Sequence, residues 1–282
     1  EEMLEVGRKK QSLFIGIPKE TEFQEQRVAL VPEAVSLLVS NGHRVVIETN
    51  AGTNANFTDN DFSEAGAKIA YSSDEVYESD IILKVTPPSI KEISMMKHKQ
   101  ILFSALQLTV QPGDALKKLI TKKITAIAWD YIEDEEGVFP VIRSMGEIAG
   151  TTSILIAGEL MRNANNGKGL MLGGVAGITP PEVVIIGAGT VGQFAAKAAL
   201  SLGVSVKVFD NSVAKLRRIQ RDLGHRVFTS VIQPKVLSKA LKRCDVAIGA
   251  LRVPHGRTPC VVSEQMIRDM KESSVIVDVS ID

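Results

Sequence analysis

Glycines in the second half of the chain have the spacing that brings a backbone close to a phosphate group. Residues 183–192 read V-V-I-I-G-A-G-T-V-G, an apolar run that turns at Gly187 into an alanine-rich segment. In such a pattern the first glycine permits a sharp turn, the second lets a diphosphate approach the main chain, and the third lets a helix pack on the strand. The N–H groups and dipole of that helix attract the diphosphate. The pattern predicts a dinucleotide site that includes Gly187, Ala188, Gly189, Thr190, Val191 and Gly192.

Asp210 ends the next apolar run, residues 204–209, and favours one type of dinucleotide. A carboxylate at the tip of that predicted strand can accept hydrogen bonds from the ribose hydroxyls of adenosine. The same charge repels a 2′-phosphate, so the sequence predicts NAD rather than NADP as the cofactor.

Further residues are expected around this cofactor. Lys215 can contact a cofactor phosphate, whereas Arg217 and Arg218 have the arrangement of a solvated helix face. Ala250 and Leu251, at the end of the apolar run 246–250, are expected to line the same site.

Two basic residues in the first half of the chain could hold a substrate. Arg27 carries a planar guanidinium that can bind a carboxylate bidentately, although an arginine here is more often a surface residue paired with Glu20 or Glu25. Lys84 ends an apolar run before Pro87, at the end of a predicted strand, where parallel α/β sheets bind ligands. It is a candidate acid or substrate anchor, and the alternative is a lysine whose ammonium reaches solvent from a strand end.

Composition excludes several other classes of protein. Lysine plus arginine equals aspartate plus glutamate at 33 each, and aromatic residues are 5%, so we predict no nucleic-acid partner. No membrane-spanning run or signal peptide is seen, and the expected location is the cytoplasm. Cys244, Cys260 and four scattered histidines form no metal-ligand pattern.

Apolar runs alternate with helix-like segments throughout, which predicts two doubly wound parallel α/β domains. An apolar helix over residues 145–163 is expected to lead from the first domain into the second. We therefore predict an N-terminal substrate domain, 1–144, and a Rossmann NAD-binding domain, 145–282. The chain ends just past a strand, so the second domain is expected to be truncated at its C-terminal end.

A series of short motifs runs in order along the chain: I-P-K-E at 17–20, E-Q-R-V-A-L at 25–30, L-K-V at 83–85, M-G-E-I-A-G at 145–150 and V-D-V-S-I-D at 277–282. Together they resemble the alanine dehydrogenases and the related NAD-binding domain of proton-translocating transhydrogenase. The resemblance begins near Leu13 and continues to the last residue. Residues 168–175, K-G-L-M-L-G-G-V, favour alanine dehydrogenase, and the Arg-Ala-Gln segment of the transhydrogenase nicotinamide loop is not visible.

The resemblance implies an activity and a set of site residues. It implies a flavodoxin/formate-dehydrogenase-like first domain, homo-oligomers that are commonly hexamers, and reversible oxidative deamination of L-alanine to pyruvate and ammonia. Arg27 and Lys84 would bind the small amino or 2-oxo acid. Asp282 would lie near the nicotinamide and take part in the amine and imine chemistry.

Gln107 departs from the family pattern, because alanine-oxidising members have a histidine in this strand-end segment. A glutamine that lines the substrate pocket can hydrogen-bond the substrate, but it cannot exchange a proton near neutral pH. Either Lys84, Asp282 or a water then transfers the proton, or the enzyme acts on another substrate, or it no longer turns over. The alternatives to an alanine dehydrogenase are an NAD(H)-binding subunit of a transhydrogenase and a non-catalytic NAD-binding protein.

Overall fold

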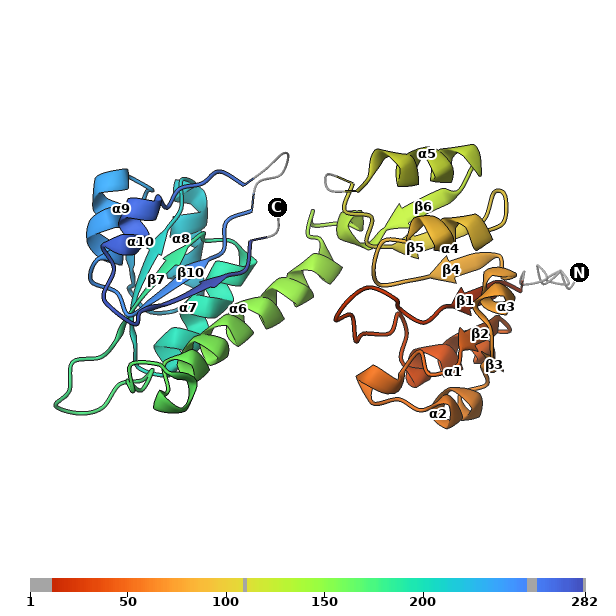
Figure 1. Cartoon of the computed structure of the whole chain (residues 1–282), viewed down its shortest axis with the longest axis horizontal. Helices are drawn as coiled ribbons and strands as arrows, with labels where there is room; N and C mark the ends of the chain where they lie inside the picture. Colours follow the sequence, from red (N-terminus) through yellow and green to blue (C-terminus); the bar gives the residue numbers. More distant parts are fainter. Residues whose placement is uncertain (1–11, 109–110, 253–257, 281–282) are drawn as a thin grey trace, which may run out of the picture. The chain divides into compact units, whose positions relative to one another are not determined.

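The computed structural model describes residues 12–108, 111–252 and 258–280, and the chain divides into two compact units (Figure 1). Unit 1 is Glu1–Phe139 and unit 2 is Pro140–Asp282. Each unit is built on one parallel sheet with helices on both faces, so the predicted pair of doubly wound parallel α/β folds is confirmed.

The sheet of unit 1 has six strands in the order β3-β2-β1-β4-β5-β6, and every neighbouring pair is parallel. The strands are β1 (Phe14–Ile17), β2 (Arg44–Glu48), β3 (Lys68–Ala70), β4 (Ile81–Leu83), β5 (Ile101–Ser104) and β6 (Thr125–Ala128). The helices are α1 (Pro32–Ser40), α2 (Asp59–Glu64), α3 (Ser73–Tyr77), α4 (Ile90–Met95) and α5 (Gly113–Thr121), with 3₁₀ turns η1 (Thr53–Ala55) and η2 (Trp129–Tyr131).

Alternating side chains of the unit 1 strands fill a core on each face of the sheet. On one face, β1 and β4 pack against buried Val35 of α1 and Phe62 of α2. On the other face, Ile82 of β4 packs with Tyr77 of α3 and Ile93 of α4. Because neighbouring residues of a strand point to opposite faces, Lys84 follows Ile82 onto the face that carries α3 and α4.

Unit 2 has a five-stranded parallel sheet in the order β11-β10-β7-β8-β9. The strands are β7 (Glu182–Ile186), β8 (Ser205–Phe209), β9 (Phe228–Ser230), β10 (Val246–Gly249) and β11 (Val275–Asp278). The helices are α6 (Pro140–Leu160), α7 (Thr190–Ser201), α8 (Val213–Asp222), α9 (Pro234–Leu241) and α10 (Glu264–Arg268), with a 3₁₀ turn η3 (Asn163–Asn165).

Helix α6 begins at Pro140, where a proline is tolerated because the first helical N–H needs no partner. It therefore starts five residues before the helix that the sequence predicts, and the border between the compact units lies before it. Gly150 of α6 is buried against α7. Its missing side chain brings the two helices close together at the start of α7.

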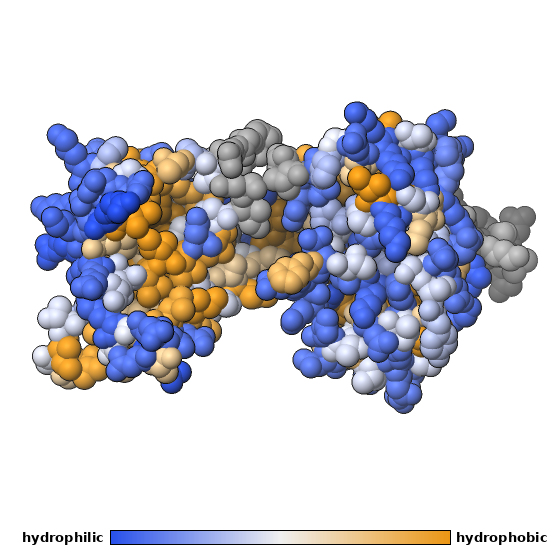
Figure 2. All heavy atoms as spheres, in the orientation of Figure 1, coloured by the Kyte–Doolittle hydropathy of each residue, from blue (hydrophilic) through white to orange (hydrophobic). Residues whose placement is uncertain are grey.

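Apolar side chains also reach the surface of unit 2. Figure 2 shows them gathered where Figure 1 draws α6 and β11, and the exposed ones include Ile148, Leu155 and Ile276. Among the described residues, no helix combines the length and the apolar character needed to cross a membrane.

Candidate active site

Both sheets place the predicted site residues at the same topological position. In unit 1, β1 and β4 lie side by side at the point where the strand order reverses, and in unit 2, β7 and β10 do. Ligands of open parallel sheets bind outside the carboxyl ends of such a strand pair. Lys84 follows β4 in unit 1, and Gly187 and Ala250 follow β7 and β10 in unit 2. Each unit therefore has its own candidate binding position.

The glycine turn of unit 2 gives its glycines different roles. Gly187 has a φ of 119°, and a side chain there would meet the Ala250 carbonyl oxygen at 2.2 Å. A side chain at Gly192 would lie 1.8 Å from the Gly187 oxygen. At Gly189, by contrast, an added Cβ would meet nothing within 4 Å. The backbone at Gly189 is thus open to an incoming group, while its neighbours are closed by packing.

Helix α7 starts directly at this open position. Gly189 is its N-cap residue, and no described side chain caps the turn. The N–H groups of the first turn, from Thr190 onward, have no helical acceptors and point away from the helix with its positive dipole end. The residues present therefore fit the diphosphate of a dinucleotide.

Asp210 lies just after β8 and hydrogen-bonds the glycine turn. Its Oδ2 accepts a hydrogen bond from the Ala188 backbone N–H at 2.7 Å, and its Oδ1 accepts one from the Ser212 N–H at 2.7 Å. The residue is 6% exposed. Each oxygen has a second lone pair, so the predicted contact with a ribose would add to these bonds rather than replace them.

Helix α8 contributes a residue that the sequence did not single out for this site. The Arg218 guanidinium donates to the Ala188 carbonyl oxygen at 3.4 Å, so Arg218 reaches the glycine turn although it is exposed. Lys215 is half-buried in the first turn of α8. Ala250 is buried beside the turn and its N–H donates to the Ile186 oxygen at 2.8 Å, while Leu251 is half-buried.

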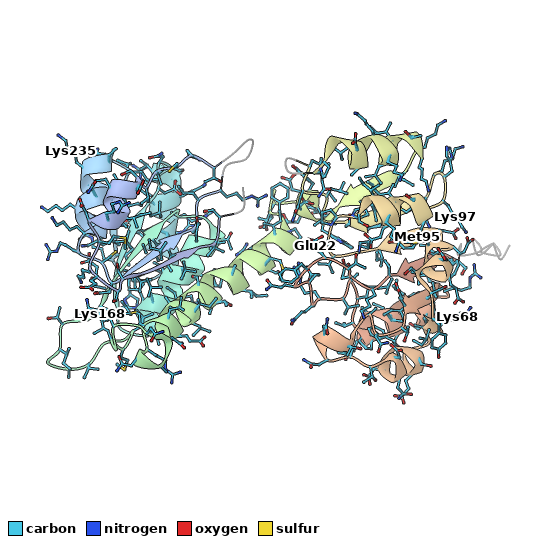
Figure 3. The ribbon with its side chains drawn as sticks, viewed as in Figure 1. Glu22, Lys68, Met95, Lys97, Lys168 and Lys235 are labelled. Carbon is cyan, nitrogen blue, oxygen red and sulfur yellow. The ribbon has the colours of Figure 1, made fainter. Side chains whose placement is uncertain are left out.

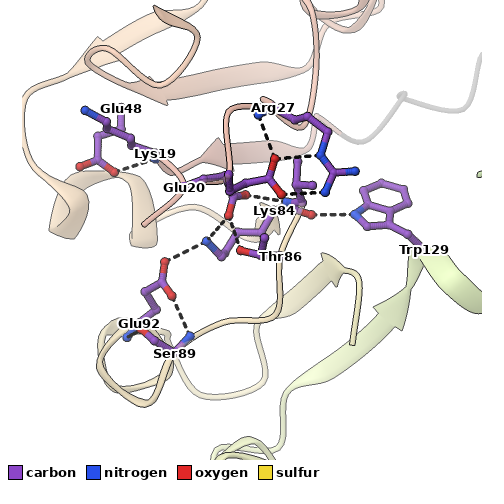
Figure 4. A network of polar contacts seen from close by, with 11 residues as sticks. Lys19, Glu20, Arg27, Glu48, Lys84, Thr86, Ser89, Glu92 and Trp129 are labelled. Atoms are coloured by element: carbon purple, nitrogen blue, oxygen red, sulfur yellow. Dashed lines mark hydrogen bonds and ion pairs between the residues drawn. The ribbon is translucent and has the colours of Figure 1, made fainter. Parts of the chain in front are cut away.

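Lys84 is the centre of a buried polar cluster in unit 1 (Figure 4). Its side chain is 1% exposed, and its Nζ lies 2.9 Å from Glu20 Oε2 and 2.9 Å from Glu92 Oε1. The Trp129 indole N–H donates to the Lys84 carbonyl oxygen at 2.7 Å. Lys84 is therefore an internal ion-paired lysine, and the alternative of an ammonium that reaches solvent from the strand end is wrong.

Glu92 is the residue of this cluster that sequence reasoning missed. It lies on α4, where it closes a capping box: its Oε2 accepts the Ser89 N–H at 2.7 Å and its own N–H donates to the Ser89 hydroxyl. Burial alone would raise the pKa of Glu92, but the charge of Lys84 and the hydrogen bonds from Lys84 and Ser89 outweigh it and lower that pKa. Glu92 is thus held as a carboxylate.

Tyr77 of α3 is buried near the same carboxylates. Burial, and then the negative charges of Glu92 and Glu20, raise the pKa of its hydroxyl, which stays neutral. Among the described residues the hydroxyl has no hydrogen-bond partner.

Arg27 forms a bidentate pair with Glu25. Its Nε donates to Glu25 Oε1 at 2.8 Å and its Nη2 donates to Glu25 Oε2 at 2.6 Å. These hydrogen bonds lower the pKa of Glu25 and raise that of Arg27. The Arg27 side chain is 54% exposed at a shallow pocket also lined by Lys19, Glu20, Asn50 and Asn54.

Two predicted site residues remain, Gln107 and Asp282. Gln107 is exposed in the loop after β5, in the left-handed region at a φ of 44°. The Asp130 carboxylate accepts the N–H of the preceding Leu106 at 3.2 Å and so supports this loop. Asp282 lies outside the described residues. Within the described ranges, no group of histidine, cysteine and acidic residues could hold a metal ion.

Comparison with known proteins adds relatives that cover nearly the whole chain. The model of the alanine dehydrogenase/PNT N-terminal domain matches residues 16–149, and that of the C-terminal domain matches residues 153–282. The alanine dehydrogenase of Methanococcus maripaludis is 38% identical over 271 residues, which are 96% of this chain and 72% of that protein.

Solved structures agree with these matches. A structure of an L-alanine dehydrogenase has 37% sequence identity and a TM-score of 0.87, over 95% of this chain and 74% of that one. The transhydrogenase from Sinorhizobium meliloti has 24% identity and a TM-score of 0.80, over 93% of this chain and 77% of that one, so its likeness concerns the fold alone. On its sequence matches, the chain belongs to the alanine dehydrogenase/PNT family.

Proposed function

We propose that the protein is an NAD-dependent alanine dehydrogenase. It would convert L-alanine, NAD⁺ and water to pyruvate, ammonium, NADH and a proton, and catalyse the reverse reaction. The observation that carries the proposal is the chain-wide match to alanine dehydrogenases, and a buried lysine at the switch point of unit 1 of this chain agrees with it. The N-terminal domain would bind the substrate and the C-terminal domain the cofactor.

In unit 2 the open backbone at Gly189 and the first turn of α7 would hold the diphosphate of NAD. Asp210 would accept ribose hydroxyls with its free lone pairs and disfavour a 2′-phosphate. Lys215, Ala250 and Leu251 would complete the site. Bound NAD supplies a hydride acceptor, and NADH a hydride donor.

In unit 1 the substrate would meet two cations of different kinds. Arg27 would bind the substrate carboxylate with its planar guanidinium. Because that guanidinium already donates to Glu25, it would have to share its N–H groups between the two carboxylates or release Glu25. The Lys84 ammonium would hydrogen-bond the oxygen of the 2-oxo group and hold it in position. Gln107 would hydrogen-bond the substrate without exchanging a proton, which leaves proton transfer to Asp282, Lys84 or a water.

The experiment is a screen of 2-oxo acids with ammonium and NADH, and of amino acids with NAD⁺. We expect turnover with pyruvate and L-alanine, and its loss in Lys84→Met. NADH binding, followed by fluorescence, should stay unchanged in this variant because Lys84 belongs to unit 1.

Gln107 supports a second candidate, a non-catalytic NAD-binding protein, because it lacks the proton chemistry of a histidine. That candidate predicts NADH binding without turnover on any substrate of the screen. We also propose that the protein is cytoplasmic and forms a homo-oligomer, with a hexamer as the expected size. Light scattering of the purified protein would test the number of subunits.

A further inference from the structure

We propose that Glu92 and Glu20 are positioning residues that hold the Lys84 ammonium in place, with one N–H left for the substrate oxygen. The inference rests on the proposed function for the identity of that substrate. It also decides between the two roles considered for Lys84, since it makes Lys84 an anchor and not a proton donor.

The hydrogen bonds of the Lys84 ammonium show that one of its N–H groups is available to a ligand. A lysine ammonium has three N–H donors. One is taken by Glu20 Oε2 and one by Glu92 Oε1, each at 2.9 Å. Among the residues that the structure describes, no third acceptor contacts Nζ. The third N–H is therefore the one that a bound ligand can use.

Both carboxylates are themselves held in place, so the ammonium cannot follow a mobile partner. Glu20 Oε1 accepts the Val85 backbone N–H at 2.6 Å, and its Oε2 also accepts the Thr86 hydroxyl at 2.5 Å. Glu92 Oε2 is bound to the start of α4 through the Ser89 N–H. The side chains of Glu20 and Glu92 are 5% and 7% exposed.

The charges of the cluster argue against proton donation by Lys84. Two buried carboxylates surround one buried ammonium, so the cluster has an excess of negative charge. If Lys84 gave its proton to the substrate, both carboxylates would lose their buried cation, which is strongly unfavourable. Proton transfer must then come from another group, and Lys84 acts by charge and position.

Glu92→Gln tests the proposal, because Glu92 uses its two oxygens for different donors. A glutamine has one oxygen, so it cannot accept from both Lys84 and the Ser89 N–H. The matched control is Asp61→Asn, the same acid-to-amide change at the acidic member of the capping box of α2, where Asp61 pairs with no described lysine. Both bonds from Thr58 go to Asp61 Oδ2, so one amide oxygen can still accept them, whereas Glu92→Gln must give up one of its two donors.

Kinetics with pyruvate, ammonium and NADH form the first measurement. For Glu92→Gln we expect KM for pyruvate to rise at least about tenfold, while kcat and KM for NADH change less than about threefold, because uniform binding is lost. Asp61→Asn should stay within about twofold of the wild type. Glu20→Gln, expected to behave as Glu92→Gln does, serves as the second variant if Glu92→Gln does not fold.

Acylation of lysines by acetic anhydride, mapped by mass spectrometry, is the second measurement and needs no activity. Lys68 and Lys97 extend outward from unit 1 (Figure 3), with side chains 69% and 43% exposed, and provide internal references. We expect Lys84 to react at least about tenfold more slowly than these lysines in the wild type, and several-fold faster in Glu92→Gln than in Asp61→Asn.

The two measurements separate this inference from the proposed function. A wild type without turnover on pyruvate or alanine would contradict the function, and the labelling of Lys84 would then decide the positioning role alone. A folded Glu92→Gln with unchanged KM for pyruvate and unchanged labelling of Lys84 would overturn the inference. A fall in kcat at constant KM would also overturn it, because that result assigns Lys84 to the chemical step.

Discussion

Replacement of Gly150 by alanine measures how strongly the cofactor turn depends on the close packing of α6 on α7. A Cβ at Gly150 would lie 2.3 Å from the Val191 carbonyl oxygen and 3.0 Å from the Ala195 nitrogen, both of which are backbone atoms of α7. Neither atom can move without the helix, so α6 must shift. Val191 belongs to the first turn of α7, where we place the diphosphate.

The magnitude follows from two opposing effects. Overpacking of a core costs about 1–3 kcal/mol, and a backbone contact this short belongs at the upper end. Alanine is favoured over glycine inside a helix by about 1 kcal/mol. We therefore expect Gly150→Ala to destabilise unit 2 by about 2 kcal/mol, a fall in Tm of roughly 4–8 °C.

Gly158 of the same helix provides the matched control. A Cβ there would meet only Leu172 side-chain atoms, at 3.7 Å and beyond. Gly158→Ala keeps the gain in helix propensity without the clash, so its Tm should equal or exceed that of the wild type. Differential scanning fluorimetry gives the Tm values, and NADH fluorescence titration should show about tenfold weaker binding for Gly150→Ala alone. Equal Tm shifts in the two variants would refute the packing argument.

Three further predictions concern single side chains. Asp210→Asn leaves one oxygen for two backbone N–H groups, so we expect a loss of about 1–3 kcal/mol and weaker NADH binding, seen by thermal unfolding and fluorescence titration. Burial raises the pKa of Cys244 to about 12, and Cys260 is exposed, so a thiol reagent should titrate Cys260 alone in the native protein and both after denaturation. The pKa of Glu92 is lowered below its ordinary value of 4.5, so its pair with Lys84 stabilises the fold above about pH 4.5 and fades as the pH falls through the folded pKa. The difference in Tm between wild type and Glu92→Gln should accordingly be full at pH 7 and shrink below about pH 4, and a difference that grew on acidification would contradict this sign.

Local patterns in the sequence predicted most of the fold. The apolar runs that became β4, β7 and β10 were visible, since buried parallel strands read as continuous apolar segments. The short elements β3, α3 and α4 were not predicted. Each has six residues or fewer, and most of its stability comes from packing rather than from its own propensity.

The candidate cofactor site could be predicted for a related reason. Its glycines, the acid that follows and the intervening helix are close together in the sequence, and Gly187 and Gly192 are required by backbone geometry. What the sequence did not reveal is that Asp210 already binds the turn through the Ala188 N–H, or that Arg218 reaches the Ala188 oxygen. The first contact depends on the distance between the ends of β7 and β8, and the second on where α8 packs.

Local periodicity and residue type were enough to predict the fold class, the glycine turn and the candidacy of Lys84 and Arg27. The surroundings of Lys84 became visible only in the folded chain. Glu20 follows β1 and Glu92 lies on α4, and they meet the ammonium because β1 and β4 are neighbours in the sheet while α4 packs on the face that Lys84 points to. No spacing along the chain encodes that meeting, since it arises from strand order and helix packing.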